Sequence, residues 1–435
     1  MPVGMLLVFL KEIENSLEGR SMVMRKMIFG FLAALLVVAT GVYGAPTTLN
    51  ALFMKQAGYS EDDVTAGTRE FEKANPNIKV VLTFVPYEQL EEKIITSAQA
   101  GSYDVVLSDG PFTAKFAKAS IIKEVPALSA ADQKDIFGGA ILSTVYGGKS
   151  WGMPWLNDCK YLFYNKKVLA AAGFANPPRT WDELLSQAKV IKAKNLVKYP
   201  IAWSWTQAEA LMCDYTILSA AFGGAMFDKD GNPTLTAAGN KRALDFMVKT
   251  LSEGVTNPNS LEFVEDDVLS TFSNGDAAFG LNWTYMYNGA KDPSKSKVVN
   301  DIAVALIPGS DKVASATVNG GQPLSISAGT KQDKAAWQYI LYMASKDFQR
   351  KHPANALPIW KSLYDDKDVI ASSPEVVKIA KDQYNYLVNR PSLPYYSEFS
   401  TDFQARIQDV LRGKKTSDKA LAEEQAFAAA LAAKK

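Results

Sequence analysis

The sequence predicts an α/β protein with two lobes, and three observations support this fold class. At 435 residues the chain is long for one hydrophobic core, so two domains are expected. Residues 48–107 alternate strand and helix, and a second alternation runs through residues 180–306. Between them, residues 146–169 gather glycines, a proline, tryptophans and tyrosines around Asp158, which favours a strand that crosses between two lobes.

The first alternation has clear local signals. Residues 48–53 and the β-rich residues 78–85 are expected strands, and Ser60 caps a helix that starts with three acidic residues. Residues 87–100 place apolar side chains on one helical face, and residues 103–107 form a continuous apolar strand. This β-α-β-α-β order predicts a parallel sheet with helices on both faces.

The second alternation starts at Thr180, where T-x-x-E forms a capping box with Glu183. The Gly320-Gly321 pair then joins two short expected strands, because glycine allows close backbone approach or a tight turn. Further helices are expected at residues 208–222, 237–251, 331–344, 374–388, 397–411 and 417–433, and further strands at residues 200–204, 272–283 and 301–306.

Asp109 and Asp158 are the first candidate site residues. Asp109 follows the third strand, where ligands bind in open α/β sheets, but it is equally a turn or cap residue, and the two roles are compatible. Enzyme signatures are scarce, since His352 is the only histidine and the common nucleophile, zinc and phosphate-loop motifs are absent. A pair of carboxylates, as in glycoside hydrolysis, remains open.

The first 44 residues are expected to be a leader and signal peptide. A basic segment beginning at Met24 precedes the apolar residues 27–39, which are too few to span a membrane, and cleavage is expected after Gly44. Met24 is the expected true start, and no lipoprotein cysteine follows, so a periplasmic location is expected. Basic and acidic residues then balance, which argues against a nucleic-acid partner. Whether Cys159 and Cys213 form a disulfide stays open.

Several motifs together resemble a known family. They are FEKANPNIKVVLTFVPYEQLEEKI, YDVVLSDG, WGMPWLNDCKYLFYNKKVL, FSNGDAAFGLNW, ATVNGGQPLSIS and RPSLPYYSEFS. In this order they are similar to the extracellular solute-binding proteins of ABC sugar importers, the maltose- and trehalose-binding group. The likeness spans about residues 47–415.

The resemblance implies a fold like that of type II periplasmic binding proteins, two α/β lobes joined by hinge strands with a ligand cleft between them. The N-terminal lobe would hold residues 47–154 plus about 308–360. The C-terminal lobe would hold residues 155–306 plus about 361–435, with the first hinge crossing at Met153-Pro154-Trp155.

The resemblance also implies a carbohydrate site. Carboxylates would accept hydrogen bonds from sugar hydroxyls, tryptophan rings would cover the apolar faces of a sugar, and a glycine-rich loop would bring backbone close to the ligand. The implied binding residues are Asp109, Trp155, Asp158, Trp283, Gly320, Gly321 and Arg390. Trp205, Tyr285 and Trp360 are further candidates from their positions near strand or loop ends, with a core role as the alternative.

The expected function is the binding component of an ABC importer. It would capture a mono- or oligosaccharide in the cleft and deliver it to the transmembrane permease and its ATPase, as a monomer without metal, cofactor or catalytic activity. One alternative is a secreted glycoside hydrolase using Asp109 and Asp158. Another is a receptor for a polyol or glycerol phosphate, although the neutral overall charge favours an uncharged sugar.

Overall fold

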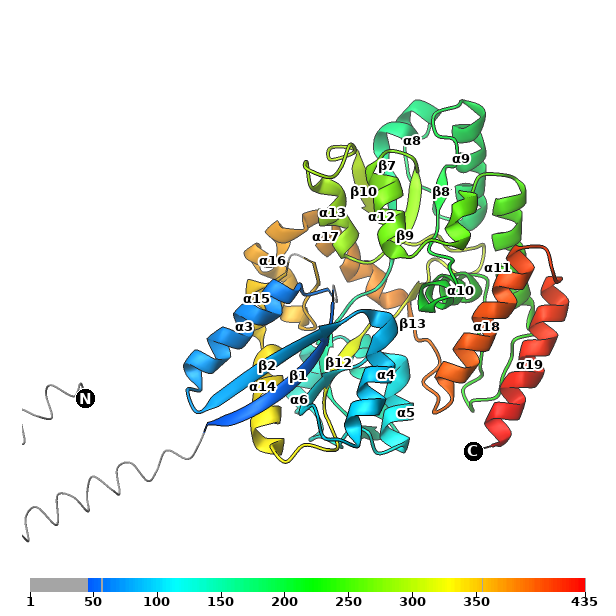
Figure 1. Ribbon diagram of the computed structural model, residues 1–435. Coiled ribbons are helices and arrows are strands. Elements are labelled where there is room, and N and C mark those ends of the chain that lie inside the picture. Colours follow the sequence, from blue (N-terminus) through cyan, green and yellow to red (C-terminus); the bar gives the residue numbers. More distant parts are fainter. Residues whose placement is uncertain (1–45, 56–57, 354, 435) are drawn as a thin grey trace, which may run out of the picture.

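A computed structural model describes residues 46–55, 58–353 and 355–434 of the chain. The expected leader, with its start at Met24 and its cleavage after Gly44, lies outside the described residues. Two β-sheets, each covered by helices, form the two lobes (Figure 1). The predicted fold class of two α/β lobes is therefore confirmed.

The first sheet has the strand order β2-β1-β3-β12-β6. Its β1 pairs in parallel with β2 and β3, as the β-α-β-α-β pattern predicts, because a helix connects each of these strands to the next. Strand β12 is antiparallel to both β3 and β6 and returns from a much later part of the chain. The strands are β1 (Thr47–Met54), β2 (Ile78–Val85), β3 (Val105–Leu107), β6 (Met153–Leu156) and β12 (Gln322–Ile326).

Helices and a short hairpin surround the first sheet. Ser60 and Asp63 form a capping box at the start of α3, which fixes the helix where the sequence predicts it. The elements are α3 (Glu61–Ala74), α4 (Tyr87–Ala98), η1 (Gly110–Phe112), α5 (Thr113–Lys118), α6 (Ala130–Asp135), α7 (Gly138–Leu142), β4 (Val145–Tyr146), β5 (Lys149–Ser150), α14 (Asp333–Met343) and α15 (Lys346–Lys351).

The second sheet has the order β10-β7-β9-β8 and mixes both pairing modes. Strands β10, β7 and β9 are antiparallel neighbours, whereas β8 is parallel to β9. The strands are β7 (Tyr161–Asn165), β8 (Ile201–Ala202), β9 (Phe279–Asn282) and β10 (Ile302–Ala305).

The helices that follow β7 and the C-terminal helices complete the structure. Helices α18 and α19 pack against each other and against α11, and α18 also contacts η1 of the first lobe (Figure 1). The elements are α8 (Lys166–Ala172), α9 (Trp181–Ala193), α10 (Glu209–Ala221), α11 (Ala238–Ser252), η2 (Pro258–Leu261), α12 (Glu265–Ser273), α13 (Tyr285–Lys291), η3 (Lys361–Asp365), α16 (Lys367–Ser372), α17 (Pro374–Gln383), η4 (Tyr384–Tyr386), α18 (Tyr396–Leu411) and α19 (Ser417–Ala433). Among the described residues, no helix is both long and apolar enough to cross a bilayer.

The chain passes between the sheets more than once. Strand β6 lies wholly in the first sheet and β7 starts at Tyr161 in the second, so the first crossing follows Leu156 and comes after Met153-Pro154-Trp155. Trp155, assigned by the predicted division to the second lobe, is part of the first sheet. A later connection pairs β11 (Thr317–Val318) in parallel with β13 (Leu387–Val388). These connecting segments carry several of the candidate residues.

Candidate functional site

A cavity of about 500 Å³ lies between the two sheets. The first lobe lines it with residues at the carboxyl ends of β1, β2 and β3, which is where open α/β sheets bind ligands. Gln322, the first residue of β12, reaches the same edge because β12 runs antiparallel to β3. The second lobe contributes the starts of α10 and α12 and the segment after β9.

Six of the predicted site residues line this cavity. They come from separate parts of the chain, and the fold brings them together from both lobes and the connecting segments. They are Asp109, Asp158, Trp283, Tyr285, Gly320 and Arg390.

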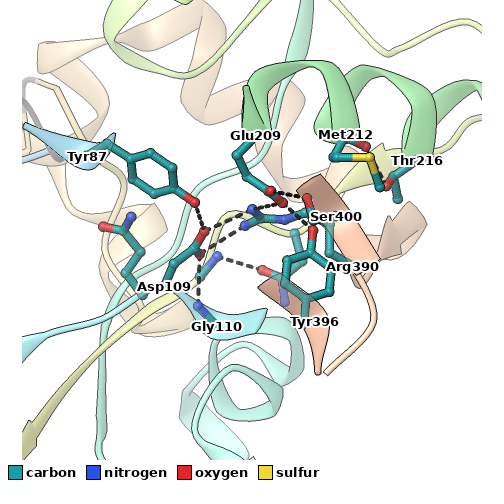
Figure 2. Close-up of polar contacts among 12 residues, drawn as sticks. Tyr87, Asp109, Gly110, Glu209, Met212, Thr216, Arg390, Tyr396 and Ser400 are labelled. Carbon is teal, nitrogen blue, oxygen red and sulfur yellow. Dashed lines mark hydrogen bonds and ion pairs between the residues drawn. The ribbon is translucent and has the colours of Figure 1, made fainter. Parts of the chain in front are cut away.

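Asp109 is held on both carboxylate oxygens. Its Oδ1 accepts from the backbone N–H of Gly110 at 2.8 Å, so it caps η1, and its Oδ2 accepts from the Tyr87 hydroxyl at 2.8 Å. Arg390 adds a bidentate contact, Nη1 to Oδ2 at 2.8 Å and Nη2 to Oδ1 at 2.9 Å (Figure 2). The turn role and the cavity role left open for Asp109 thus occur together.

Arg390 also bridges to Glu209 at the start of α10. Its Nη1 lies 2.9 Å from Glu209 Oε1, which also accepts from the Tyr396 hydroxyl, while Ser400 donates to Oε2 at 2.7 Å (Figure 2). Burial raises the pKa of Glu209, and the charge of Arg390 opposes that shift. One guanidinium therefore joins a first-lobe carboxylate to a second-lobe carboxylate, a geometry that arginine's planar fork suits.

Asp158 has a different environment. Its Oδ1 accepts from the Cys159 N–H at 2.8 Å and from the Thr284 hydroxyl at 2.7 Å. No described residue donates a hydrogen bond to its Oδ2, and no described basic side chain forms an ion pair with it. Burial raises the pKa of Asp158 to about 7, and the hydrogen bond from Thr284 opposes that shift.

Trp283 depends on Gly320 for its position. A Cβ on Gly320 would lie 2.5 Å from Cζ3 of the Trp283 ring, so only glycine allows this approach. Glu265 accepts from Trp283 Nε1 at 3.2 Å, and the buried Lys160, which lies 2.8 Å from Asp214, places its Nζ 5.5 Å from the ring centroid. The ring is thereby fixed at the cavity wall.

Three predicted aromatic residues lie in the core instead. Trp155 is fully buried, packs on Phe53 and Tyr59, and donates its Nε1 hydrogen to the Met343 carbonyl. In this position its ring cannot cover the face of a sugar in the cavity, although the sequence predicts that role. Trp205 stacks on Trp203 in the second-lobe core. Trp360 is 6% exposed, donates to the Ala344 carbonyl and is also a core residue.

Gly321 faces a second cavity of about 440 Å³. A Cβ there would lie 3.2 Å from the Ser143 side chain, away from the Trp283 side. Arg390 lines both cavities. Cys159 and Cys213, whose pairing stayed open, are both buried free thiols.

Among the lining residues that sequence reasoning missed, Tyr87, Glu209 and Gln322 bear most on the polar contacts of the cavity. Tyr87 follows the second strand just as Asp109 follows the third, so the same strand-end argument applies to it. Gln322 comes directly after the Gly320-Gly321 pair. Glu209 stands at a predicted helix start, where an acid is expected for helix stability alone.

The cavity thus offers an aromatic ring, several carboxylates and an amide at one place. Such groups suit a ligand with apolar CH faces and many hydroxyls, because rings cover the former and carboxylates accept strong hydrogen bonds from the latter. Both oxygens of Asp109 already accept hydrogen bonds within the protein, from Arg390, Tyr87 and Gly110.

Comparisons with known proteins identify relatives and a solved structure similar to this chain. The chain is 27% identical over 337 residues to a probable ABC transporter-binding protein of Deinococcus radiodurans, covering 74% of this chain and 79% of the relative. It is 24% identical over 390 residues to a mannitol-binding protein of Pseudomonas aeruginosa, covering 82% of this chain and 87% of the relative. The maltose-bound MalE3 of T. maritima superposes with a TM-score of 0.80 at 25% identity, over 88% of this chain and all of that structure.

The family model of the bacterial extracellular solute-binding proteins matches residues 45–350. Those residues hold both sheets and most of the cavity-lining side chains. Because the match covers more than half of the chain, this protein belongs to the bacterial extracellular solute-binding proteins, the binding components of ABC importers.

Proposed function

We propose that this protein captures a small carbohydrate or polyol in the cavity between its lobes and delivers it to an ABC permease. The observation that carries the proposal is the cavity itself, where the Trp283 ring stands among Asp109, Asp158 and Gln322. A relative named for mannitol and a structure solved with maltose support a polyhydroxylated ligand. The ligand would be held by both lobes, so its binding favours the closed form.

The lobes that close would follow the predicted division, residues 47–154 with about 308–360 against residues 155–306 with about 361–435, except that β6 stays whole in the first lobe. The closed monomer would dock on the transmembrane subunits, and ATP-driven opening of the permease would release the solute. Export to the periplasm through a cleaved signal peptide ending at Gly44 belongs to the same proposal.

Binding without turnover is the proposed outcome. Glycoside hydrolysis needs one carboxyl that can give a proton and a second that activates water or attacks the sugar. Asp109 is engaged by a bidentate arginine, a backbone N–H and a tyrosine, and this arrangement favours a fixed acceptor over a proton donor.

Isothermal titration of the mature protein against monosaccharides, disaccharides and polyols tests the proposal. A saturable heat with at least one of them is expected, and the absence of any heat or thermal shift across the whole panel would overturn it. Recovery of the unchanged ligand after long incubation is expected, whereas released monosaccharide from a bound disaccharide would establish an enzyme.

A further inference from the structure

Carboxylates outnumber basic groups around the main cavity. Asp109 and Glu209 share Arg390, and Glu265 lies 3.7 Å from Lys160, but the other acids have no ion-pair partner among the described residues. The unpaired acids are Asp158 on the buried wall and Glu61, Glu88 and Asp266 at exposed positions, and Lys55 is the remaining basic residue of the lining. The cavity is therefore electronegative, and that surplus disfavours an anionic ligand.

Two acceptor atoms of the cavity-lining side chains receive no hydrogen bond from a described residue. Asp158 is 4% exposed, and its Oδ2 receives no hydrogen bond from a described residue, although Oδ1 accepts from the Thr284 hydroxyl and the Cys159 N–H. Gln322 is 6% exposed, and within the described part of the chain its Oε1 has no hydrogen-bond partner and its Nε2 has only Met54 Sδ, at 4.0 Å. A buried acceptor without a donor is costly, as for Gln322 Oε1, and Asp158 Oδ2 is a further acceptor in the same lining. A ligand that donates hydrogen bonds to these two atoms would supply the missing partners.

The groups around Asp158 cannot supply a positive charge. The titratable side chains that interact with it are Tyr59, Cys159, Tyr161, Tyr364 and Tyr384. Burial raises the pKa of each of these groups, so all of them are neutral near pH 7. Lys55, the other basic residue of the lining, forms no ion pair with Asp158 in the described residues. A cationic ligand group would supply the counter-charge, and a proton on Asp158 would remove the need for one.

We propose that the cavity selects polyhydroxylated solutes that carry a primary amine, such as amino sugars or amino polyols, and rejects their phosphorylated counterparts. This inference rests on the proposed function and adds that the captured ligand carries a positive charge. An ammonium group has three donors and no acceptor, so it matches Asp158 Oδ2 and Gln322 Oε1, and its charge makes the bond to the carboxylate charge-assisted. A phosphate offers acceptors where the cavity already has acceptors.

Matched ligand series test the proposal. Titration calorimetry at about pH 7.5 would compare D-glucose, D-glucosamine and D-glucose 6-phosphate, then sorbitol, 1-amino-1-deoxysorbitol and sorbitol 6-phosphate. Within a series that binds, the amine is expected to bind about tenfold to hundredfold tighter than the neutral parent, and the phosphate to bind weakest.

The variant Asp158→Asn is expected to remove the advantage of the amine and bring its affinity close to that of the neutral parent. Glu424→Gln is the matched control, because Glu424 is another fully buried carboxyl but lies on α19 outside the cavity, so the amine should keep its advantage there. A ratio of affinities is insensitive to a general loss of folded protein, which affects both ligands equally.

The possible outcomes distinguish a failure of the amine preference from a failure of the proposed function. Binding of the neutral parents with equal or weaker binding of the amines would overturn the amine preference and leave sugar or polyol capture standing. Tight binding of a phosphate would overturn the charge argument in the same way. Absence of binding by every compound of both series and by the wider sugar panel would overturn the proposed function and this inference with it.

Discussion

Asp109 and Asp158 stand in the same cavity and are equally buried, yet the fold treats them in opposite ways. Asp109 at the end of β3 receives Arg390, Tyr87 and Gly110 on its two oxygens. Asp158, on the connection after β6, has Thr284 and Cys159 on one oxygen and nothing from the described residues on the other. One carboxylate is completed by the protein, and the other is left for a ligand or a proton.

This difference teaches that residue type and position do not fix the role of a buried acid. Both aspartates follow a strand and both were predicted to accept hydrogen bonds from a sugar. Their partners come from segments far away in sequence, since Arg390 lies beyond β13 and Thr284 beyond β9. The partner sets the charge state and therefore the role.

The largest effect on stability is expected from Arg390→Met, which removes the guanidinium that pairs with Asp109. Two carboxylates, Asp109 and Glu209, would then share a buried site without a counter-charge, at a cost of about 3–5 kcal/mol in the free energy of unfolding. Urea denaturation measures it. Lys149→Met is the control, because the Lys149–Glu124 pair is at least half exposed and should contribute less than about 1 kcal/mol. An equal loss of unfolding free energy in Arg390→Met and Lys149→Met would contradict the role of Arg390 as the partner that stabilises Asp109.

The next effect concerns Asp158 and pH. Its pKa in the folded protein is about 7 against an ordinary 3.8, so the folded state keeps a proton that the unfolded state releases between these values. Ligand-free stability should therefore fall as pH rises through this window, by up to about 1.4 kcal/mol per unit from this group. Asp158→Asn should remove that part of the slope and be more stable than the parent by up to about 4 kcal/mol at about pH 8.

Chemical denaturation at a series of pH values checks the sign. Burial also raises the pKa values of Glu209, Asp214 and Glu424, so the parent retains some slope from them and the difference between the two proteins is the informative quantity. Parallel curves for parent and variant would contradict the raised pKa of Asp158.

Gly320→Ala should weaken ligand binding in the main cavity without unfolding the protein. The new Cβ would meet the Trp283 ring at 2.5 Å and push it from the cavity wall, with an expected loss of about tenfold in affinity, or about 1.4 kcal/mol. Calorimetry with the best ligand measures it. Gly138→Ala, where a Cβ would meet nothing within 4 Å, should leave affinity unchanged. Unaltered binding in Gly320→Ala would remove Trp283 from the site.

The smallest effect is expected from Tyr87→Phe. It deletes one of the donors to Asp109 but leaves Arg390 and the Gly110 N–H in place, so stability should fall by only about 1 kcal/mol. Tyr146→Phe is a suitable control, since no hydrogen bond joins its hydroxyl to a described residue. A loss in Tyr87→Phe as large as in Arg390→Met would mean that the tyrosine, and not the arginine, holds Asp109.

The sequence by itself determined the regular part of this protein. Apolar runs predicted strands at β1, β2 and β3, a capping box predicted α3, and alternation of strands and helices predicted two α/β lobes, because these features depend on neighbours a few residues away. The rule that ligands bind at the carboxyl ends of strands also found Asp109, although the same rule was not applied to Tyr87.

Tertiary structure alone decided which aromatic rings and which carboxylates serve the cavity. Trp155 and Trp283 both stand near lobe-crossing or strand-end positions, yet Trp155 points into the core of the first lobe and Trp283 lies against Gly320 at the cavity. Arg390 meets Asp109 across most of the chain. Such pairings depend on how the sheets pack and where the connections cross. The local periodicity of a sequence does not predict them.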